Sequence, residues 1–195
     1  MKKLTAILLP FVFVAMSCMN SNKPEKVEMK SQDENPHQSE SEKLIENRGE
    51  EIAFADFTLD KPEEWVVREP SSEMRLVELV SPKSPENPVV GFYFGNRDEM
   101  VDANINRWRG QFAEEENFNR ETMDDGQVYV EIDGTYKLKP FPMAQEFTET
   151  PDYKMLAAIL PSDKGPYFFK ITGPASELNN LEEEFLSFLN SYKKE

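Results

Sequence analysis

Few residues in this 195-residue chain have side chains suited to nucleophilic catalysis or to binding soft metals. There is one cysteine, Cys18, and one histidine, His37, and both lie ahead of the segment that we expect to fold. The folded part therefore lacks the groups needed for Ser-His-Asp and Cys-His sites. It also lacks the usual zinc and copper ligands, and a single cysteine forms no internal disulfide. We predict no catalytic residue, no metal and no cofactor.

Carboxylates are the remaining candidates for chemistry, because the chain has 37 Asp and Glu residues. They occur in adjacent groups at predicted turns and helix ends, such as Glu63–Glu64, Glu114–Glu116 and Asp124–Asp125. A glycosidase needs two carboxylates across a cleft, one with a raised pKa, and adjacent exposed acids do not supply this arrangement. Asp124 and Asp125 could begin a calcium loop, but the next residues do not continue the EF-hand ligand spacing. We interpret them as part of a turn.

Three polar residues are the sharpest candidates for a binding patch. Asn104, Arg107 and Gln111 are spaced by three and four, so they share one flank of a predicted helix over residues 100–112. One interpretation is that they hydrogen-bond to neighbouring loops of their own domain. The other is that they dock a protein partner or a small anionic ligand through the forked guanidinium of Arg107.

The predicted helix has a clear apolar face and a strand in front of it. Ile105, Trp108 and Phe112 continue a spacing that keeps one side of a helix apolar. Asn96 and Glu99 fit a capping box at its start. The preceding run, residues 89–94, is almost wholly apolar, which is typical of a strand buried on both faces. We therefore expect the helix to pack on a sheet directly after a central strand.

The other elements predict a mixed α/β domain (α+β). Glu114–Glu116 are expected to lead the chain from the helix into water, and residues 137–152, with three prolines, are expected to form a long loop. We expect a mostly antiparallel sheet with helices packed on it. The expected strands are 52–59 (bulged or split in two), 65–68, 74–80, 127–136 and the hairpin 155–160 with 166–172, and a final helix runs from Pro174 to Tyr192.

The N-terminus predicts a bacterial lipoprotein signal peptide over residues 1–17. Lys2 and Lys3 precede an apolar run that is too short to span a bilayer. The residues up to Cys18 resemble a lipobox, with Ser17 as the small residue before the cut, although Ala15 stands where leucine is common. We expect Cys18 to carry acyl chains such as palmitate, which would anchor the protein in a membrane. An ordinary secreted protein with an incidental cysteine is the alternative.

The segment 18–50 is predicted to be a disordered tether, and the folded domain is predicted over 51–195. The segment is rich in Ser, Asn, Gln, Glu and Lys and has almost no large apolar residue, so it cannot bury enough surface to fold. The expected location is the cell envelope. Met19 follows the cysteine, where some bacteria use aspartate to retain lipoproteins at the inner membrane, so we favour the outer membrane if the organism has one.

The net charge of the chain limits the classes of partner that we expect it to bind. The formal net charge is -15. A polyanion would be repelled, so we expect no nucleic acid as a partner. Adsorption to anionic lipid through a basic face is disfavoured for the same reason.

Several stretches together resemble the PsbP-like fold, a superfamily that includes the extrinsic PsbP subunit of photosystem II and, more distantly, a eukaryotic Ran-binding nuclear import factor. The resemblance covers roughly residues 57–192. The stretches that carry it are the strand into Pro-x-x-Trp over 57–65, the mid-chain helix, the strand 126–136, and the hairpin feeding a helix that ends Phe-Leu-Ser-Phe at 185–188.

A closer resemblance is to bacterial proteins of unassigned function. They share an Ala-Asn-x-x-Arg-Trp-x-x-Gln-Phe helix, here 103–112, a Met-Leu-Ala-Ala-Ile strand, here 155–159, and a Tyr-Phe-Phe-Lys-x-x-Gly-Pro strand, here 167–174. The PsbP-like fold, and not the likeness to these proteins, implies a non-catalytic binding or assembly role, an implication from fold alone.

These observations predict a lipid-anchored, non-catalytic binding or assembly module of the cell envelope. Its partners would be the membrane, through Cys18, and a protein whose identity the sequence does not give. The alternatives are a carboxylate-based envelope hydrolase and a periplasmic carrier of small ligands.

Overall fold

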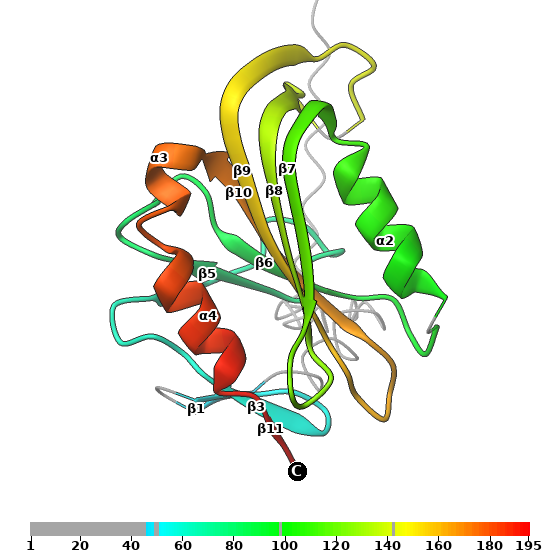
Figure 1. Ribbon diagram of the computed structural model, residues 1–195. Coiled ribbons are helices and arrows are strands. Elements are labelled where there is room, and N and C mark those ends of the chain that lie inside the picture. The colour runs from blue at the N-terminus through cyan, green and yellow to red at the C-terminus, as the bar shows by residue number, and fades with distance from the viewer. Residues whose placement is uncertain (1–45, 49–50, 98, 142) are drawn as a thin grey trace, which may run out of the picture. The chain divides into compact units, whose positions relative to one another are not determined.

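The computed structural model describes residues 46–48, 51–97, 99–141 and 143–195 (Figure 1). The predicted signal peptide, Cys18, His37 and most of the predicted tether lie outside these residues. Strand β1 (Glu46–Arg48) falls within the range predicted as tether and pairs with β2. No helix in the described part is long and apolar enough to cross a membrane.

The domain is built on a seven-stranded sheet in which every pair of neighbours is antiparallel. This confirms the predicted α+β class with a mostly antiparallel sheet. The strands, in order across the sheet, are β4 (Val66–Arg68), β5 (Val77–Val80), β6 (Val89–Tyr93), β10 (Tyr167–Pro174), β9 (Thr148–Leu160), β8 (Val128–Leu138) and β7 (Phe112–Thr122).

A second, smaller sheet brings the two ends of the described chain together. Its order is β1, β2 (Glu51–Ala53), β3 (Phe57–Asp60) and β11 (Lys193–Lys194). The sequence predicted either one bulged strand or two short strands over residues 52–59, and β2 and β3 show that there are two. Strand β11 pairs with β3 directly after the last helix, which fixes that helix against the domain.

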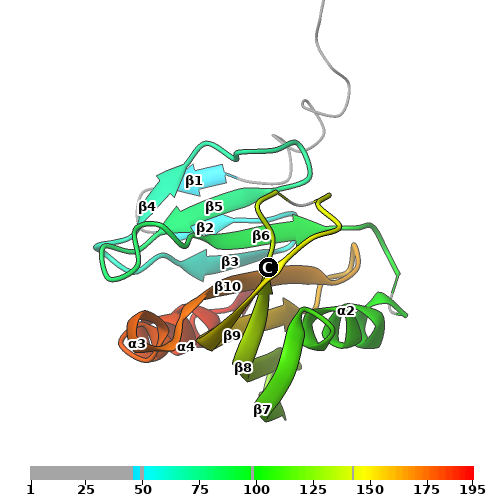
Figure 2. The same ribbon diagram turned by 90° about the horizontal axis from the view of Figure 1, so that it is seen from above.

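Helices cover both faces of the larger sheet (Figures 1 and 2). Helix α2 (Met100–Arg109) covers one face, where Ile105 and Trp108 pack into an apolar cluster with β8, β9 and β10. Helices α3 (Ala175–Leu178) and α4 (Glu182–Asn190) cover the other face, in a larger cluster that includes Phe57 of β3. The predicted apolar positions of the final helix are all buried; they are Leu178, Leu181, Phe185, Phe188 and Tyr192.

Helix α2 connects two strands, β6 and β7, that are not neighbours in the sheet. Strand β6 lies inside the sheet, next to β10, whereas β7 forms the far edge. The chain must therefore cross three strands between the end of β6 and the start of β7. Helix α2 makes this crossing over one face, and Trp108, which is 1% exposed, packs edge-on against Phe168 of β10 at 6.3 Å between ring centroids.

Strand β7 corrects the prediction that Glu114–Glu116 lead the chain into water. These residues belong to an eleven-residue edge strand paired with β8. The pairing register shifts twice within the strand, so Phe112, Glu115 and Phe118, its more buried residues, are three apart and not two. Bulges of this kind remove the period-two alternation by which a strand is predicted.

The long loop predicted over residues 137–152 is also shorter than expected. Strand β8 continues to Leu138 and β9 begins at Thr148, which leaves only 139–147 as the turn. Pro151 lies inside β9 at the place where the pairing of Gly134 and Tyr136 with β9 shifts register. A missing backbone N–H is tolerated at such an irregularity, so this proline did not mark a loop.

Three smaller predictions about element ends were wrong. Helix α2 begins at Met100 with Glu99 as its N-cap and no side-chain cap, so the predicted Asn96–Glu99 capping box is not formed. The predicted final helix is two helices, α3 and α4. Strand β5 begins at Val77, and Met74, predicted within that strand, is exposed in the preceding turn.

Candidate functional site

One row of residues across the larger sheet brings charged side chains to the face that carries α2. The register aligns Arg68 of β4, Glu78 of β5, Val90 of β6 and Lys170 of β10 as successive cross-strand neighbours. Glu78 and Lys170 each lie between two residues whose side chains face the α4 core. Because side chains alternate along a strand, both charged side chains point to the α2 face.

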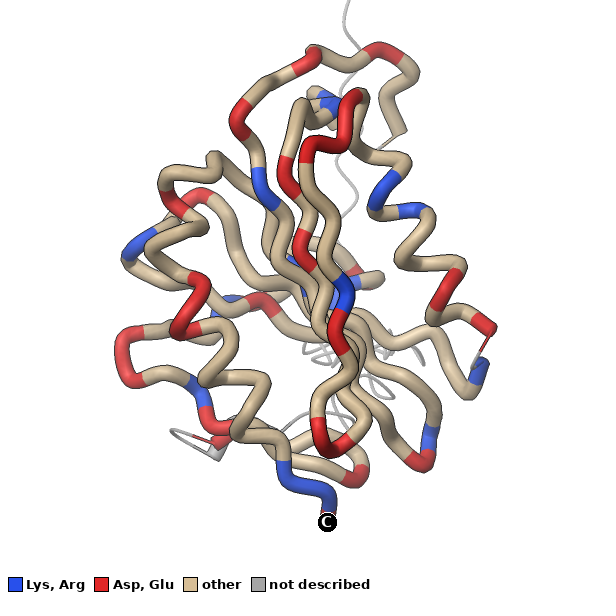
Figure 3. The backbone as a smooth tube through the Cα atoms, in the orientation of Figure 1, with Lys and Arg blue, Asp and Glu red and all other residues tan. Residues whose placement is uncertain are grey.

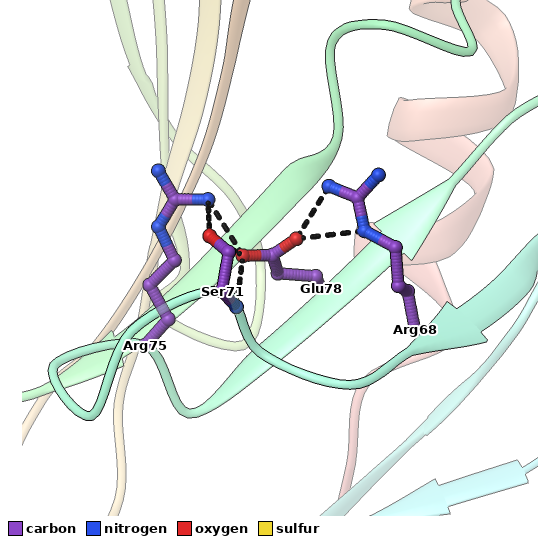
Figure 4. A network of polar contacts seen from close by, with 4 residues as sticks. All are labelled: Arg68, Ser71, Arg75 and Glu78. Carbon is purple, nitrogen blue, oxygen red and sulfur yellow. Dashed lines mark hydrogen bonds and ion pairs between the residues drawn. The ribbon is translucent and has the colours of Figure 1, made fainter. Parts of the chain in front are cut away.

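The carboxylate of Glu78 is wholly buried and fully partnered (Figure 4). It accepts hydrogen bonds from the Ser71 amide at 2.9 Å and the Ser71 hydroxyl at 2.7 Å. Arg68 and Arg75 complete the set, with Nε and Nη2 of Arg68 at 3.0 Å and 2.5 Å and Nη1 of Arg75 at 2.6 Å. Burial by itself would raise the pKa of Glu78, but these bonds outweigh it and lower the pKa to about 2.

Lys170, two strands away in the same row, has a different environment. Its Nζ donates to Oε1 of Gln111 at 3.1 Å, and the Tyr136 hydroxyl donates to the same oxygen at 3.3 Å. Among the described residues it forms no ion pair with a carboxylate. Burial, followed by the nearby charges of Arg107 and Arg75, lowers the pKa of Lys170 to about 8.

Asn104 and Arg107 lie on the same flank of α2 and are linked to each other. Asn104 is buried, and its amide donates to the Met100 carbonyl at 2.9 Å. Its side-chain oxygen accepts a bond from Nη2 of Arg107 at 2.7 Å. The Arg107 guanidinium is exposed and lies 5.9 Å from the centre of the Phe94 ring. Asn104 thus orients Arg107 while the rest of the guanidinium fork faces solvent.

We call Lys170, Arg107, Gln111 and Asn104 the Lys170 cluster. The structure therefore places all three residues of the sequence-predicted patch together. Asn104 and Gln111 bond within their own domain, as the first interpretation expects, whereas Arg107 keeps donors at the surface. Lys170 was not predicted as a site residue. Its only signal in the sequence was a lysine inside an otherwise apolar strand, Tyr-Phe-Phe-Lys-Ile.

Two other arginines on or beside α2, Arg109 and Arg120, have acidic partners, unlike Arg107. Arg109 forms a two-pronged pair with Glu115, with both bonds at 2.8 Å. Arg120 of β7 pairs with Asp102 of α2 at 2.9 Å. Arg107 has no such pair with any carboxylate that the structure describes.

A second group of charges, on the α4 face, surrounds one buried lysine with carboxylates. Lys154 of β9 donates to Glu131 at 2.5 Å and lies 3.5 Å from Asp133 and 3.4 Å from Glu182. Burial would lower the pKa of Lys154, but these three carboxylates outweigh it and raise the pKa. Tyr129 also donates to Glu182, at 3.3 Å. The cation of this group therefore has acidic partners within the domain, and its contacts with Glu182 tie β9 to α4.

Among the described residues, no group of three or more His, Cys, Asp or Glu side chains is placed to hold a metal ion. The carboxylate with the strongest shift, Glu78, is held ionised by its partners and is not a proton donor near neutral pH. A hollow of about 140 Å³, lined mainly by apolar residues such as Val101, Ile159 and Pro161, shares no lining residue with the Lys170 cluster. The cluster is suited to binding an anion.

Comparisons with known proteins give a structural likeness only. No protein-family model matches the chain, and no curated protein matches it either. Among solved structures, the chain is similar to the solution structure of cyanobacterial PsbP (CyanoP) from Synechocystis sp. PCC 6803. The TM-score is 0.45 and the sequence identity 12%, over 72% of this chain and 87% of that chain. No statement about family or binding follows from a likeness at this level.

Proposed function

We propose that the protein is a lipid-anchored, non-catalytic binding or assembly module of the cell envelope. The Lys170 cluster is its recognition site and receives an anionic group, a carboxylate of a protein partner or a small anion. The envelope location and the anchor at Cys18 come from the sequence, and the recognition site comes from the geometry of the cluster.

The observation that carries the proposal is a pair of cations without acidic partners in an acidic chain. Acidic residues outnumber Lys and Arg by 37 to 22 and are spread over the strands, helices and turns of the described part (Figure 3). Against that excess, Lys170 and Arg107 pair with no described carboxylate and bond instead to the amide oxygens of Gln111 and Asn104. A ligand that brought a carboxylate would neutralise both cations and accept their free donors.

The geometry also indicates why Arg107 and Lys170 would act together. The amide oxygen of Asn104 holds one nitrogen of the guanidinium, and the Phe94 ring lies beneath it. Gln111 holds the ammonium of Lys170 at the base of the same flank. Held side chains lose less conformational entropy when they bind, so the arrangement favours recognition.

The binding function is tested by photo-cross-linking in intact cells. A photoreactive residue replaces Ala103, which is exposed one helical turn before Arg107, so Arg107 itself stays in place. We expect a covalent adduct with a partner protein. In the same background, Arg107→Gln should reduce the adduct at least fivefold, because it removes the exposed donors.

Arg109→Gln is the matched control, because Arg109 lies on the same helix but is paired with Glu115. It should leave the adduct unchanged. Absence of any adduct, or an equal loss in both variants, would show that the flank of α2 around Arg107 is not a binding site.

The anchor is tested separately by Cys18→Ser. Acyl chains on Cys18 would hold the protein in the membrane fraction, because extraction of several chains is very unfavourable. The variant should therefore move to the soluble fraction of fractionated cells. If Cys18→Ser stays in the membrane fraction through salt and carbonate washes, the anchor assignment is wrong, whatever the result at the cluster.

A further inference from the structure

The turn between β8 and β9 exposes large apolar side chains. The other exposed large apolar residues of the described chain, Val66 and Met74, belong to β4 and to the turn after it. In the β8–β9 turn and its flanks there are four within ten residues: Leu138 (43% exposed), Phe141 (61%), Met143 (82%) and Phe147 (44%). A concentration of this kind marks a surface that contacts something other than water.

Among the described residues of the turn, one backbone hydrogen bond and one buried residue lie between the exposed apolar side chains. The Ala144 amide donates to the Phe141 carbonyl at 3.0 Å, and Ala144 itself is buried. The small residue thus faces the domain while its large neighbours face solvent. The turn lies at the top of the sheet in Figure 1, where β8 ends and β9 begins.

Lysines accompany the apolar residues of the turn. Residues 134–145 contain Lys137 and Lys139 and no acidic residue, in a chain of net charge -15. The ammonium of Lys137 lies 5.9 Å from the centre of the Phe147 ring and donates to the Gly110 carbonyl at 3.1 Å. Apolar side chains flanked by lysines suit the boundary between lipid tails and headgroup phosphates, where the lysine stems lie in the apolar layer.

We propose that the β8–β9 turn inserts Phe141, Met143 and Phe147 into the interface of a lipid bilayer. The inference rests on the proposed lipid anchor, which brings the domain to the membrane. The 27 residues from 19 to 45 separate Cys18 from β1 and span at most about 95 Å when extended, so the turn can reach the bilayer. The net charge and the nearby Glu146 and Glu149 disfavour anionic lipid, so the surface is a zwitterionic one.

The test uses the acylated full chain in phosphatidylcholine vesicles. Acylation consumes Cys18, so Met143→Cys introduces the single thiol available for an environment-sensitive fluorophore. Asp124→Cys, in the exposed turn between β7 and β8, is the matched control position. It lies at the other end of β8, roughly 35 Å away for eleven residues of strand. Some of the lipids carry a nitroxide near the headgroup, which quenches only fluorophores at the interface.

The expected result is at least twofold stronger quenching at position 143 than at position 124. Adding Phe141→Asp should reduce the quenching at 143 at least twofold, whereas Val66→Asp, an equally exposed apolar position elsewhere, should leave it unchanged. Vesicles with one third phosphatidylglycerol should give weaker quenching at 143, because their surface repels the acidic domain.

The opposing results separate this inference from the proposed function. If the protein floats with the vesicles but position 143 is no more quenched than 124, the turn is not in the membrane. If position 143 is shielded from aqueous iodide only when envelope proteins are added, the turn docks on a protein, and the lipid proposal is wrong. If the protein does not float, the anchor itself fails.

Discussion

Glu78 and Lys170 lie in one cross-strand row on the α2 face and differ in what surrounds them. Glu78 has five hydrogen-bond donors from Ser71, Arg68 and Arg75 around one buried carboxylate, and its charge is neutralised inside the domain. Lys170 donates to one amide oxygen and lies near two arginines, so no described carboxylate neutralises its charge. At the scale of single residues, the first arrangement supports folding, and the second is the one for which we propose binding.

Glu78→Gln should lower the free energy of unfolding by about 2 kcal/mol at pH 7, because the neutral amide loses most of its attraction to Arg68 and Arg75 while keeping its shape. Both arginines are partly exposed, and solvent screening weakens their attraction to Glu78. The folded-state pKa of Glu78 is lowered to about 2, so its contribution is present above the unfolded pKa of about 4.5 and is lost as pH falls toward 2.

Urea denaturation at several pH values measures this difference. The gap in stability between the wild type and Glu78→Gln should be constant from pH 7 to pH 5 and shrink below pH 4.5. A gap that is absent at pH 7, or that widens in acid, would show that the network around Glu78 contributes little to folding.

The sequence predicted the polar residues near α2 better than their partners. Asn104 and Arg107 are spaced on one flank of α2, and Gln111 follows two residues after its end, so their local spacing is visible in a sequence. Lys170 and Arg75 come from a strand and a turn far away in the chain, and only the register of β5, β6 and β10 brings them to the same face. A lysine in an apolar strand gave no indication of which face it would take.

Strand β7 and its pairing with β8 show the same limit at the scale of elements. The helix, the hairpin and the final amphipathic segment were predictable, since each follows a regular period. Strand β7 was not, because its two register shifts break the alternation and its residues are mostly polar, as an exposed edge strand permits.

Gly134 is the residue of β8 that makes this irregular pairing possible. It has a φ of +148°, and a Cβ there would lie 2.1 Å from the Glu114 carbonyl oxygen of β7. Gly134→Ala should therefore lower the free energy of unfolding by at least about 2 kcal/mol, through strain and separation of the two backbones.

Gly110→Ala is the control for that experiment. Gly110 ends α2 with ordinary helical angles, and a Cβ there would meet its nearest atom at 3.4 Å. The control should change stability by less than about 1 kcal/mol, in the stabilising direction. Equal effects of the two substitutions in urea denaturation would argue against a close approach of β7 and β8 at Gly134.

At the scale of the whole molecule, the proposed protein has three contact sites: an anchor at Cys18, the cationic Lys170 cluster and the apolar β8–β9 turn. Gln111 connects the last two, because its carbonyl accepts the Lys137 amide at 2.9 Å while its side chain holds Lys170. A partner at the Lys170 cluster would therefore lie next to the β8–β9 turn. The acidic remainder of the chain would keep the protein soluble and leave this region as the place where anions are accepted.

The central claim is that the Lys170 cluster accepts an anion, and the pKa of Lys170 tests it most directly. NMR of the acylated full chain with ¹³C-labelled lysine, in detergent micelles, gives that pKa in chloride and in acetate at equal ionic strength. We expect a pKa of about 8 in chloride and a rise of at least about 0.5 in acetate, because a bound carboxylate favours the protonated ammonium. Lys137 should show no difference between the two salts. A Lys170 pKa near 10.5 in chloride, or the same value in both salts, would contradict the account.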